Sequence, residues 1–244
     1  MMEGEIIVTR TDPIATVTIS RPSKLNAVTR EMLESFDEKV GLLTNDPQIA
    51  GIIFTGVGEK SFTAGFDLTM MAGLQGKDRT EFFKLLERSM KKVKEANTCL
   101  TLAAINGYAI GFGAMLAVAC DFRFFSKNAA LRFPEVDLGI FPGAGASSNL
   151  LGLVGPSRAK DIILSGRMVH PEEAYEIGLA NGIFEHSELL DKAMEYMKAL
   201  AGKDPKILLR AKTLIDGMTG KTVFGAAEME SAFTEEWLLE LEKE

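Results

Sequence analysis

Two glycine-flanked turns in this sequence could each direct a backbone N–H group at a bound oxygen atom. The first is KSFTAGFDL, residues 60–68, in which Ala64 and Gly65 leave room for a ligand beside the main chain. The second is INGYAIGFG, residues 105–113, which leads into an apolar helix whose first N–H groups have no partner within the helix. Two donors that converge on one point would stabilise an oxygen that gains negative charge, as in an enolate. Each turn taken alone also fits a purely structural loop.

Glu135, in the segment PEVDLGIFPGAG at 134–145, is the candidate acid or base. A loop carboxylate of this kind is also compatible with simple exposure to solvent. An apolar wall containing Met115 and Phe112 would instead raise the pKa of this carboxyl through desolvation, so that it exchanges protons near neutral pH.

Other catalytic and cofactor motifs fit the sequence less well. GFG at 111–113 lacks the third glycine of a dinucleotide fingerprint, because Leu116 stands in its place. GVGEKS at 56–61 lacks the glycine that a P-loop carries before its lysine. His170 and His186 have no metal-ligand spacing, and we expect His170 to cap the helix that follows it. No GxSxG motif occurs. We therefore expect no metal and no separate cofactor.

Apolar β-branched runs that alternate with amphipathic stretches predict an α/β fold in layers. Thr29 is expected to cap a helix that continues to about residue 46. One further helix is predicted at about 80–96, one directly after the second glycine-rich turn, and one that runs through Leu150. The chain after Gly155 is expected to be mostly helical. One stripe of the first helix is apolar and carries Met32, Leu33, Phe36, Val40 and Leu43. The expected strands lie at 15–19, 49–56, 100–105, 121–126 and 130–133.

The C-terminal part of the sequence is expected to consist of helices that pack on the core or on another subunit. Met229, Phe233, Trp237 and Leu238 lie at helical spacing there. Such a stripe fits a buried core or a subunit interface, and the sequence leaves both open. No low-complexity linker indicates a second independent domain.

Composition limits the class of protein. The chain has 244 residues, 46% of them hydrophobic, which suffices for a sizeable core. Its net charge is −7 and its basic residues are scattered among acids, so we expect no nucleic-acid partner. Cys99 and Cys120 stand without a CxxC spacing, which is typical of reduced thiols. With no apolar run long enough for a membrane helix and no signal peptide, we expect a cytoplasmic protein without membrane contact.

In order and approximate spacing, four segments resemble the crotonase (enoyl-CoA hydratase/isomerase) family. They are RPSKLNAV, FTAGFDL, INGYAIGFG and PEVDLGIFPGAG. The resemblance continues through GPSRAKDIILSGRMVHPEEAYEIGLANGI and covers nearly the whole chain. It implies an α/β fold in which a spiral of ββα repeats, residues 1–188, carries an acyl-CoA site. A C-terminal helical region, residues 189–244, would assemble homotrimers or hexamers.

The resemblance also implies roles for single residues. Ala64 and Phe112 match the two backbone donors of the family's oxyanion hole, and Glu135 matches a catalytic glutamate. The remaining matches are to residues that border the coenzyme A part of the substrate, with Asp67 equally suited to cap a helix. These are Lys24, Leu25, Ala27, Phe66, Asp67, Leu68 and Gly111.

One departure from the family's pattern bears on the reaction. The resemblance implies that hydratases of the family use two glutamates that share one water. The position of the first glutamate is occupied by Met115 in this sequence. A thioether cannot act as acid, base or water anchor at neutral pH. The family's 3-enoyl-CoA to 2-enoyl-CoA isomerases resemble this arrangement, with one glutamate at the Glu135 position. We therefore expect isomerisation with Glu135 as the single acid/base.

Two alternatives stay open: a 2-enoyl-CoA hydratase with an atypical site, and a non-catalytic acyl-CoA-binding protein. The stretch EVD at 135–137 also resembles the family's dienoyl-CoA isomerases, which makes Asp137 a second candidate carboxylate. Such an isomerase would need an Asp where Gly143 stands and another at Met115. Many relatives also end in a basic tail that covers coenzyme A, whereas this sequence ends in an acidic run. Lys77, Arg79 and Lys84 are the candidate substitutes for phosphate contacts, and ordinary surface charge explains them equally well.

Overall fold

The computed structural model describes residues 4–241. Contacts between residues divide the chain into two compact units, with the boundary between Gly202 and Lys203. The predicted boundary between residues 188 and 189 falls earlier, inside helix α7 (His186–Ala201). Helix α7 belongs to the first unit because it packs against strands of the large sheet.

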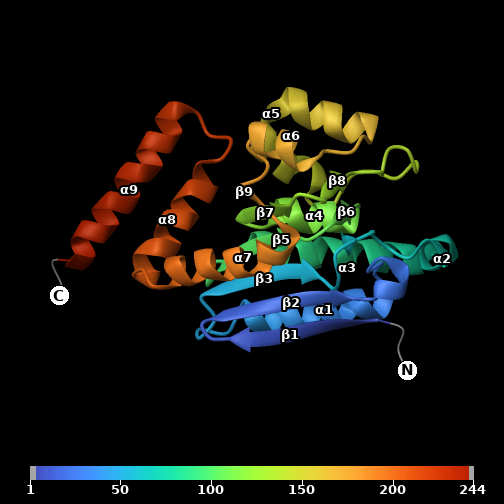
Figure 1. Ribbon diagram of the computed structural model, residues 1–244. Coiled ribbons are helices and arrows are strands. Elements are labelled where there is room, and N and C mark those ends of the chain that lie inside the picture. The colour runs from blue at the N-terminus through green and yellow to red at the C-terminus, as the bar shows by residue number, and fades with distance from the viewer. Residues whose placement is uncertain (1–3, 242–244) are drawn as a thin grey trace. The chain divides into compact units, whose positions relative to one another are not determined.

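The first unit is built on a six-stranded sheet with the order β1-β2-β3-β5-β7-β9 (Figure 1). Its neighbouring strands are parallel apart from the antiparallel pair β1 and β2. Strands β3 and β5 are buried along their whole length, as is usual for parallel strands covered on both faces. The strands are β1 (Glu5–Thr11), β2 (Ile14–Ser20), β3 (Gly51–Gly56), β5 (Leu100–Ile105), β7 (Phe122–Ser126) and β9 (Gly182–Phe184).

Three short strands form a second, parallel sheet with the order β4-β6-β8. They are β4 (Ser61–Thr63), β6 (Tyr108–Ile110) and β8 (Ala130–Arg132). Each follows a strand of the large sheet after a short connection and precedes a helix. This repetition of two strands and a helix confirms the predicted ββα spiral.

Helix α1 shows how the apolar stripe of a helix binds it to the core. The Thr29 hydroxyl accepts a hydrogen bond from the Met32 N–H at 3.3 Å, as predicted for the N-cap. The predicted stripe is buried, whereas the remaining positions, apart from the buried Asp37, are half-buried or exposed. The other helices of this unit are α2 (Leu68–Gly73), α3 (Gly76–Lys94), α4 (Phe112–Ala119), α5 (Ala146–Ser165) and α6 (Pro171–Glu176), with α1 at Arg30–Leu43 and a 3₁₀ turn at Pro22–Lys24.

Helix α4 lies at the centre of the first unit. All its residues are buried, and it contacts helices α3 and α5 as well as strands of both sheets. Helix α6 begins as predicted after His170, which occupies the N-cap position, but the His170 side chain makes no capping hydrogen bond. Helix α5 bends where Gly155 has a positive φ of 78° ahead of Pro156.

The second unit consists of helices α8 (Pro205–Met218) and α9 (Val223–Leu241). Ion pairs join them, from Lys206 to Glu240 at 2.8 Å and from Arg210 to Glu236 at 2.9 Å. In the predicted stripe, Met229 lies against Gly217 of α8, and the Phe233 ring lies under the Arg210 guanidinium. Trp237 and Leu238 are exposed, so burial in a core does not explain these two. The trimer or hexamer stays a prediction.

No helix within residues 4–241 combines the length and the apolar character needed to cross a bilayer.

Candidate active site

The turn after β4 is bent at Gly65, which has a φ of +94°. The Ala64 N–H donates to the Leu25 carbonyl at 3.0 Å, and the Gly65 N–H donates to the Thr63 hydroxyl at 3.1 Å. On the far side of the bend, Val28 donates to the Gly65 carbonyl and accepts from the Asp67 N–H. Both neighbours of Phe66 therefore face Val28.

The Phe66 N–H points away from Val28. In a strand, successive N–H groups point in opposite directions, so residues 65 and 67 face Val28 and residue 66 does not. No residue in the described part of the chain accepts a hydrogen bond from the Phe66 N–H. The prediction that Ala64 is the free donor is thus wrong in this geometry, because the Leu25 carbonyl already binds it. The free donor of this turn is on Phe66.

The second predicted donor is the Phe112 N–H. Gly111, with a φ of +51°, turns the chain from β6 into α4, and its N–H donates to the Arg132 carbonyl at 3.0 Å. Phe112 is the first residue of α4, and its N–H has no acceptor among residues 4–241. The two turns are adjacent, since a Cβ placed on Gly65 would lie 3.9 Å from the Phe112 nitrogen. The Phe66 and Phe112 rings also meet, with centroids 5.2 Å apart.

Glu135 lies over the second turn. Its Oε1 is 3.6 Å from the position that a Cβ on Gly111 would occupy. The residue is 5% exposed, and its Oε2 is buried without a hydrogen-bond partner in the described structure. Desolvation by this burial raises the pKa of the Glu135 carboxyl, and a hydrogen bond from its own backbone offsets part of the effect. A buried, unpaired carboxylate oxygen beside a backbone donor is an arrangement suited to proton transfer.

Met115 follows one helical turn after Gly111, and its N–H donates to the Gly111 carbonyl at 2.9 Å. It is buried, as is Phe112, and both belong to the apolar core cluster. The turn that carries the second donor is therefore followed by a thioether, which cannot exchange protons at neutral pH.

Asp137 is engaged elsewhere. Its Oδ2 accepts a hydrogen bond from Arg132 Nη2 at 2.7 Å, which makes an ion pair. The same oxygen lies against the Cα of Gly166, where any side chain would collide with it. Asp137 thus has a structural partner, in contrast to Glu135.

Apart from Gly111, the residues expected beside coenzyme A fall into two segments that the structure brings together. Val28 and Phe66 form a parallel bridge and the Ala64 N–H donates to the Leu25 carbonyl, so residues 25–28 run beside residues 64–67. Leu25 is 42% exposed and Leu68 is 73% exposed, so both are accessible to a ligand. Lys24 is exposed as well, whereas Ala27 is half-buried.

Asp67 has two structural contacts. Its Oδ1 accepts hydrogen bonds from the Thr69 and Met70 N–H groups and so caps α2. Its Oδ2 pairs with Arg21 Nη1 at 2.8 Å, which holds the pKa of the Asp67 carboxyl below its usual range. The capping interpretation therefore accounts for Asp67.

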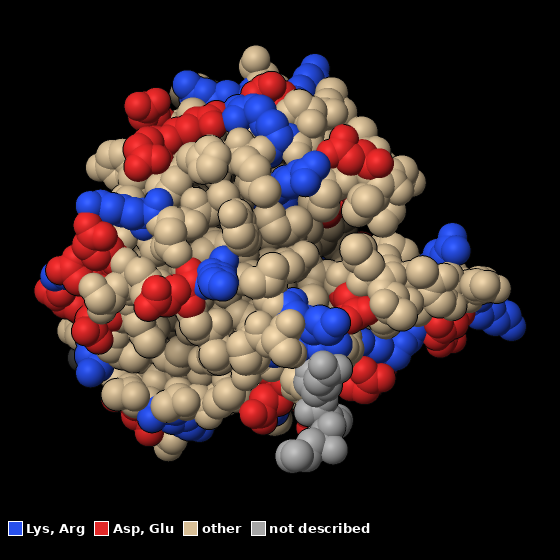
Figure 2. Space-filling view, turned by 45° about the vertical axis from the view of Figure 1, so that its right-hand side comes forward, with Lys and Arg blue, Asp and Glu red and all other residues tan. Residues whose placement is uncertain are grey.

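The candidate phosphate contacts Lys77, Arg79 and Lys84 are exposed on the first half of α3. Arg79 donates from Nε and Nη2 to the Leu74 carbonyl, which fastens the link between α2 and α3. On the face of the molecule shown in Figure 2, basic and acidic side chains are interspersed. Neither sign forms a continuous field on that face.

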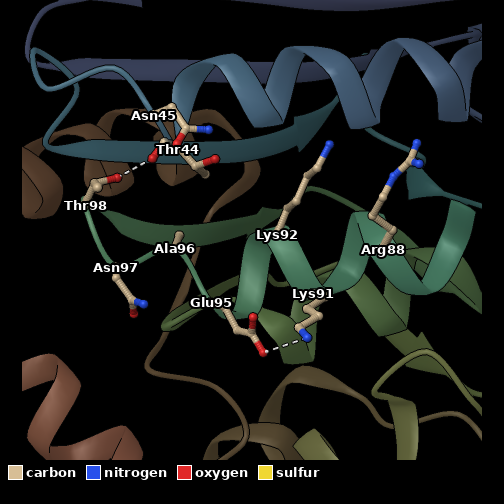
Figure 3. A pocket seen from close by; sticks show the side chains of 9 residues that line it. All are labelled: Thr44, Asn45, Arg88, Lys91, Lys92, Glu95, Ala96, Asn97 and Thr98. Carbon is tan, nitrogen blue, oxygen red and sulfur yellow. Dashed lines mark hydrogen bonds and ion pairs between the residues drawn. The ribbon is translucent and has the colours of Figure 1, made fainter.

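A separate pocket of about 390 Å³ lies between the end of α1 and the last turns of α3 (Figure 3). Most of the residues that line it are polar or charged, and two interactions join lining residues, from Lys91 to Glu95 at 3.7 Å along α3 and from the Thr98 hydroxyl to the Thr44 carbonyl. None of the predicted site residues lines it. The pocket has no part in the site described above.

Comparison with known proteins identifies the family. A family model described as Enoyl-CoA hydratase/isomerase matches residues 9–238. The chain is 35% identical over 213 residues to the short-chain-enoyl-CoA hydratase of Clostridium acetobutylicum, which covers 87% of this chain and 81% of that protein. It is 36% identical over 203 residues to the crotonyl-CoA hydratase of Syntrophomonas wolfei, with 83% and 76% covered.

Solved structures agree with the sequence relatives. A crystal structure of enoyl-CoA hydratase from Bacillus anthracis has a TM-score of 0.88 at 31% identity and covers 94% of this chain and 89% of its own. A putative enoyl-CoA hydratase from Thermobifida fusca, solved in complex with CoA, has a TM-score of 0.86 at 25% identity, with 98% and 95% covered. These matches confirm the predicted fold. The chain therefore belongs to the enoyl-CoA hydratase/isomerase, or crotonase, family and is an enzyme of the class that acts on enoyl-CoA.

Proposed function

We propose that this enzyme converts 3-enoyl-CoA to 2-enoyl-CoA, with Glu135 as the single acid/base and the N–H groups of Phe66 and Phe112 as the oxyanion donors. The observation that carries the proposal is the Glu135 carboxylate itself. It is buried over Gly111, one of its oxygens has no partner in the described structure, and Met115 stands where a second carboxylate would be needed.

The reaction needs one group that removes and returns a proton. Glu135 takes a proton from C2, and the electron pair of that C–H bond moves into the thioester, whose oxygen becomes anionic. The two N–H groups stabilise this dienolate, and each such donor contributes about 2.7–4 kcal/mol in comparable sites. The carboxyl then returns the proton to C4, so that the double bond moves from C3–C4 to C2–C3. Nothing is gained or lost overall.

The raised pKa of Glu135 suits both halves of this cycle. A carboxyl with a pKa nearer to neutral is a stronger base than an exposed one in its ionised form, and it returns its proton readily once protonated. The positive end of α4 at Phe112 adds a favourable field for the enolate oxygen.

The substrate is proposed to bind across the two segments that meet at the Val28–Phe66 bridge. Exposed Leu25 and Leu68 would border its coenzyme A portion. The structural neighbour solved in complex with CoA supports a thioester ligand for this fold. The reactive carbons would then lie between Phe66 and Glu135.

Hydration of a 2-enoyl-CoA is the second candidate, because the sequence relatives are named hydratases. That reaction needs a water held and deprotonated on one side of the double bond and a proton delivered to the neighbouring carbon. Loss of one acid/base group typically reduces such a rate by about 10²–10⁴. With Met115 in the site, we expect hydration to be the slower reaction.

The test gives one purified sample a 3-enoyl-CoA and a 2-enoyl-CoA of the same chain length. We expect formation of 2-enoyl-CoA from the first to exceed formation of 3-hydroxyacyl-CoA from the second by at least about 10-fold. In the Met115→Glu variant, hydration should rise relative to isomerisation because a second carboxylate is present. Faster hydration than isomerisation by the unaltered enzyme would overturn the proposal, and inactivity on both would favour the non-catalytic acyl-CoA-binding protein.

A further inference from the structure

Arg132 makes contacts to both parts of the proposed site. It is the last residue of β8, and its carbonyl accepts the Gly111 N–H at 3.0 Å, directly before the Phe112 donor. Its guanidinium donates from Nε to the Gly166 carbonyl at 2.6 Å and from Nη2 to Asp137 at 2.7 Å. The chain between Arg132 and Asp137 carries Glu135.

The position of the Glu135 carboxylate depends on that short loop. Its Oε2 has no hydrogen-bond partner among the described residues, so no other side chain orients the carboxylate through this oxygen. The Glu135 carbonyl, in contrast, accepts hydrogen bonds from the Leu138 and Ile140 N–H groups at 3.1 and 2.8 Å. The backbone of the loop is thus well held, and the side chain is placed by the backbone.

We propose that the Arg132–Asp137 pair is a clamp that positions Glu135 over the Gly111–Phe112 turn. The inference rests on the proposed role of Glu135. Asp137 closes the loop onto the strand, while the Arg132 backbone fixes the same strand to Gly111. Gly166 completes the clamp, because its carbonyl holds the guanidinium and its lack of a side chain leaves room for the Asp137 carboxylate.

The exposure of the Arg132–Asp137 pair distinguishes a positioning role from a general contribution to stability. The side chains of Arg132 and Asp137 are 35% and 47% exposed. Ion pairs at such exposure typically contribute about 0–1 kcal/mol to the free energy of unfolding. Loss of the pair should therefore leave the enzyme folded and act locally on the loop. Asp137 and Arg132 are positioning residues in this account, since neither touches the reacting atoms.

The experiment compares Arg132→Gln and Asp137→Asn with the unaltered enzyme. Arg10→Gln is the matched control, because Arg10 is 40% exposed and pairs with two carboxylates far from the site in sequence, Asp12 and Asp46. The primary readout is the pKa of the Glu135 carboxyl in the substrate-free enzyme, measured by carbon NMR with Glu135→Gln to assign the signal. Thermal unfolding is recorded for each variant.

The sign of the change in the pKa of Glu135 distinguishes a positioning role from a direct charge effect. Removing the Arg132 cation would by itself raise the pKa of Glu135, and removing the Asp137 anion would by itself lower it. A loosened clamp admits water to the carboxyl, so positioning predicts that both variants lower this pKa toward its ordinary value. We also expect kcat on 3-enoyl-CoA to fall about 10- to 100-fold in both, with KM changed little, as a misplaced catalytic group implies.

The outcomes separate this inference from the proposed reaction. If both variants lower the pKa of Glu135 while the unaltered enzyme lacks isomerase activity, the clamp stands and the proposed reaction fails. If the pKa moves in opposite directions in the two variants, or if kcat matches that of Arg10→Gln in an active enzyme, the clamp is overturned. Because Asp137→Asn keeps the shape of the side chain, it tests the clamp even if Arg132→Gln folds poorly.

Discussion

At the scale of single residues, the proposed site consists of one carboxylate that the fold keeps out of water. Glu135 is buried beside Gly111 with one oxygen unpaired in the described structure, and burying such a group without a partner costs about 1–3 kcal/mol. A protein keeps such a group at a cost in stability when the group has a function. This cost can be measured independently of any substrate.

Glu135→Gln should make the folded protein more stable, and the gain should grow with pH. The folded-state pKa of Glu135 is raised by desolvation, so the ionised form is the one that burial disfavours. Below the unfolded-state pKa this penalty is absent, and it develops as the pH rises through the folded-state pKa. Between about pH 5 and about pH 8, the difference in unfolding free energy between variant and parent should therefore widen until the pH has passed the folded-state pKa of Glu135 and then level off. Each 1 kcal/mol would appear as roughly 2–4 °C in Tm.

Glu31→Gln is the control for that measurement. Its own backbone hydrogen bond and the Thr29 hydroxyl lower the pKa of Glu31, so its contribution to stability is present above the ordinary pKa and is lost only as the pH falls through the folded-state value. Between about pH 5 and about pH 8 its difference from the parent should stay constant. A Glu135→Gln curve parallel to that of Glu31→Gln would show that Glu135 is not held in an unfavourable environment.

At the scale of elements, the start of α2 links the two segments that are proposed to border coenzyme A. Asp67 caps α2 and pairs with Arg21, whose side chain is only 7% exposed. The cap holds α2, while the ion pair ties the turn after β4 to the loop after β2. The two contacts can be removed separately.

Asp67→Asn retains a capping side chain and removes the charge partner of Arg21, whereas Asp67→Ala removes both. Removing one partner of a buried ion pair typically lowers the free energy of unfolding by about 3–5 kcal/mol. Because Asp67 is 18% exposed, we expect Asp67→Asn to lose that amount or less. Alanine should cost about a further 1 kcal/mol. Denaturant unfolding measures both losses, with Asp78→Asn as control because the Arg30–Asp78 pair is exposed at 24% and 56%. Equal stability of Asp67→Asn and Asp78→Asn would contradict the account.

The elements that could be predicted from the sequence are those whose apolar pattern is long. Strands β2, β3, β5 and β7 are five to seven residues long and mainly apolar or β-branched, and α1 has a clear stripe, so their positions follow from the hydrophobic pattern. Strands β4 and β6 are three residues long and lie beside glycines, so they show no period. Strand β1 alternates too weakly for its buried positions to stand out.

The parts of the site that could be predicted are likewise those that local sequence determines. The position of the Phe112 donor follows from a glycine at the start of a helix, which local sequence reveals. The choice between Ala64 and Phe66 depends on how the chain bends at Gly65 and on which N–H faces the Leu25 carbonyl. That contact joins segments far apart in the sequence, so it could not be seen there. The same holds for the Arg132–Asp137 clamp, whose partner Gly166 lies beyond the next helix.

At the scale of the whole molecule, the small parallel sheet of the first unit brings the segments that follow its three strands together. Phe66, Phe112 and Glu135 lie in the segments that follow β4, β6 and β8, and the three strands belong to one sheet. The parallel order β4-β6-β8 therefore explains why residues so far apart in the chain meet. A single side chain at such a site can change the reaction without altering the fold, and we propose that Met115 of α4 does so here.

The most direct test of the central claim is the rate at which 3-enoyl-CoA becomes 2-enoyl-CoA in the unaltered enzyme and in Glu135→Gln. The account predicts that the unaltered enzyme forms 2-enoyl-CoA and that the variant is slower by about 10²–10⁴, the usual loss for one acid/base group. Binding of the acyl-CoA should change little, because the donors on Phe66 and Phe112 are backbone groups. A Glu135→Gln enzyme that forms 2-enoyl-CoA at the unaltered rate would remove Glu135 from the reaction and contradict the account.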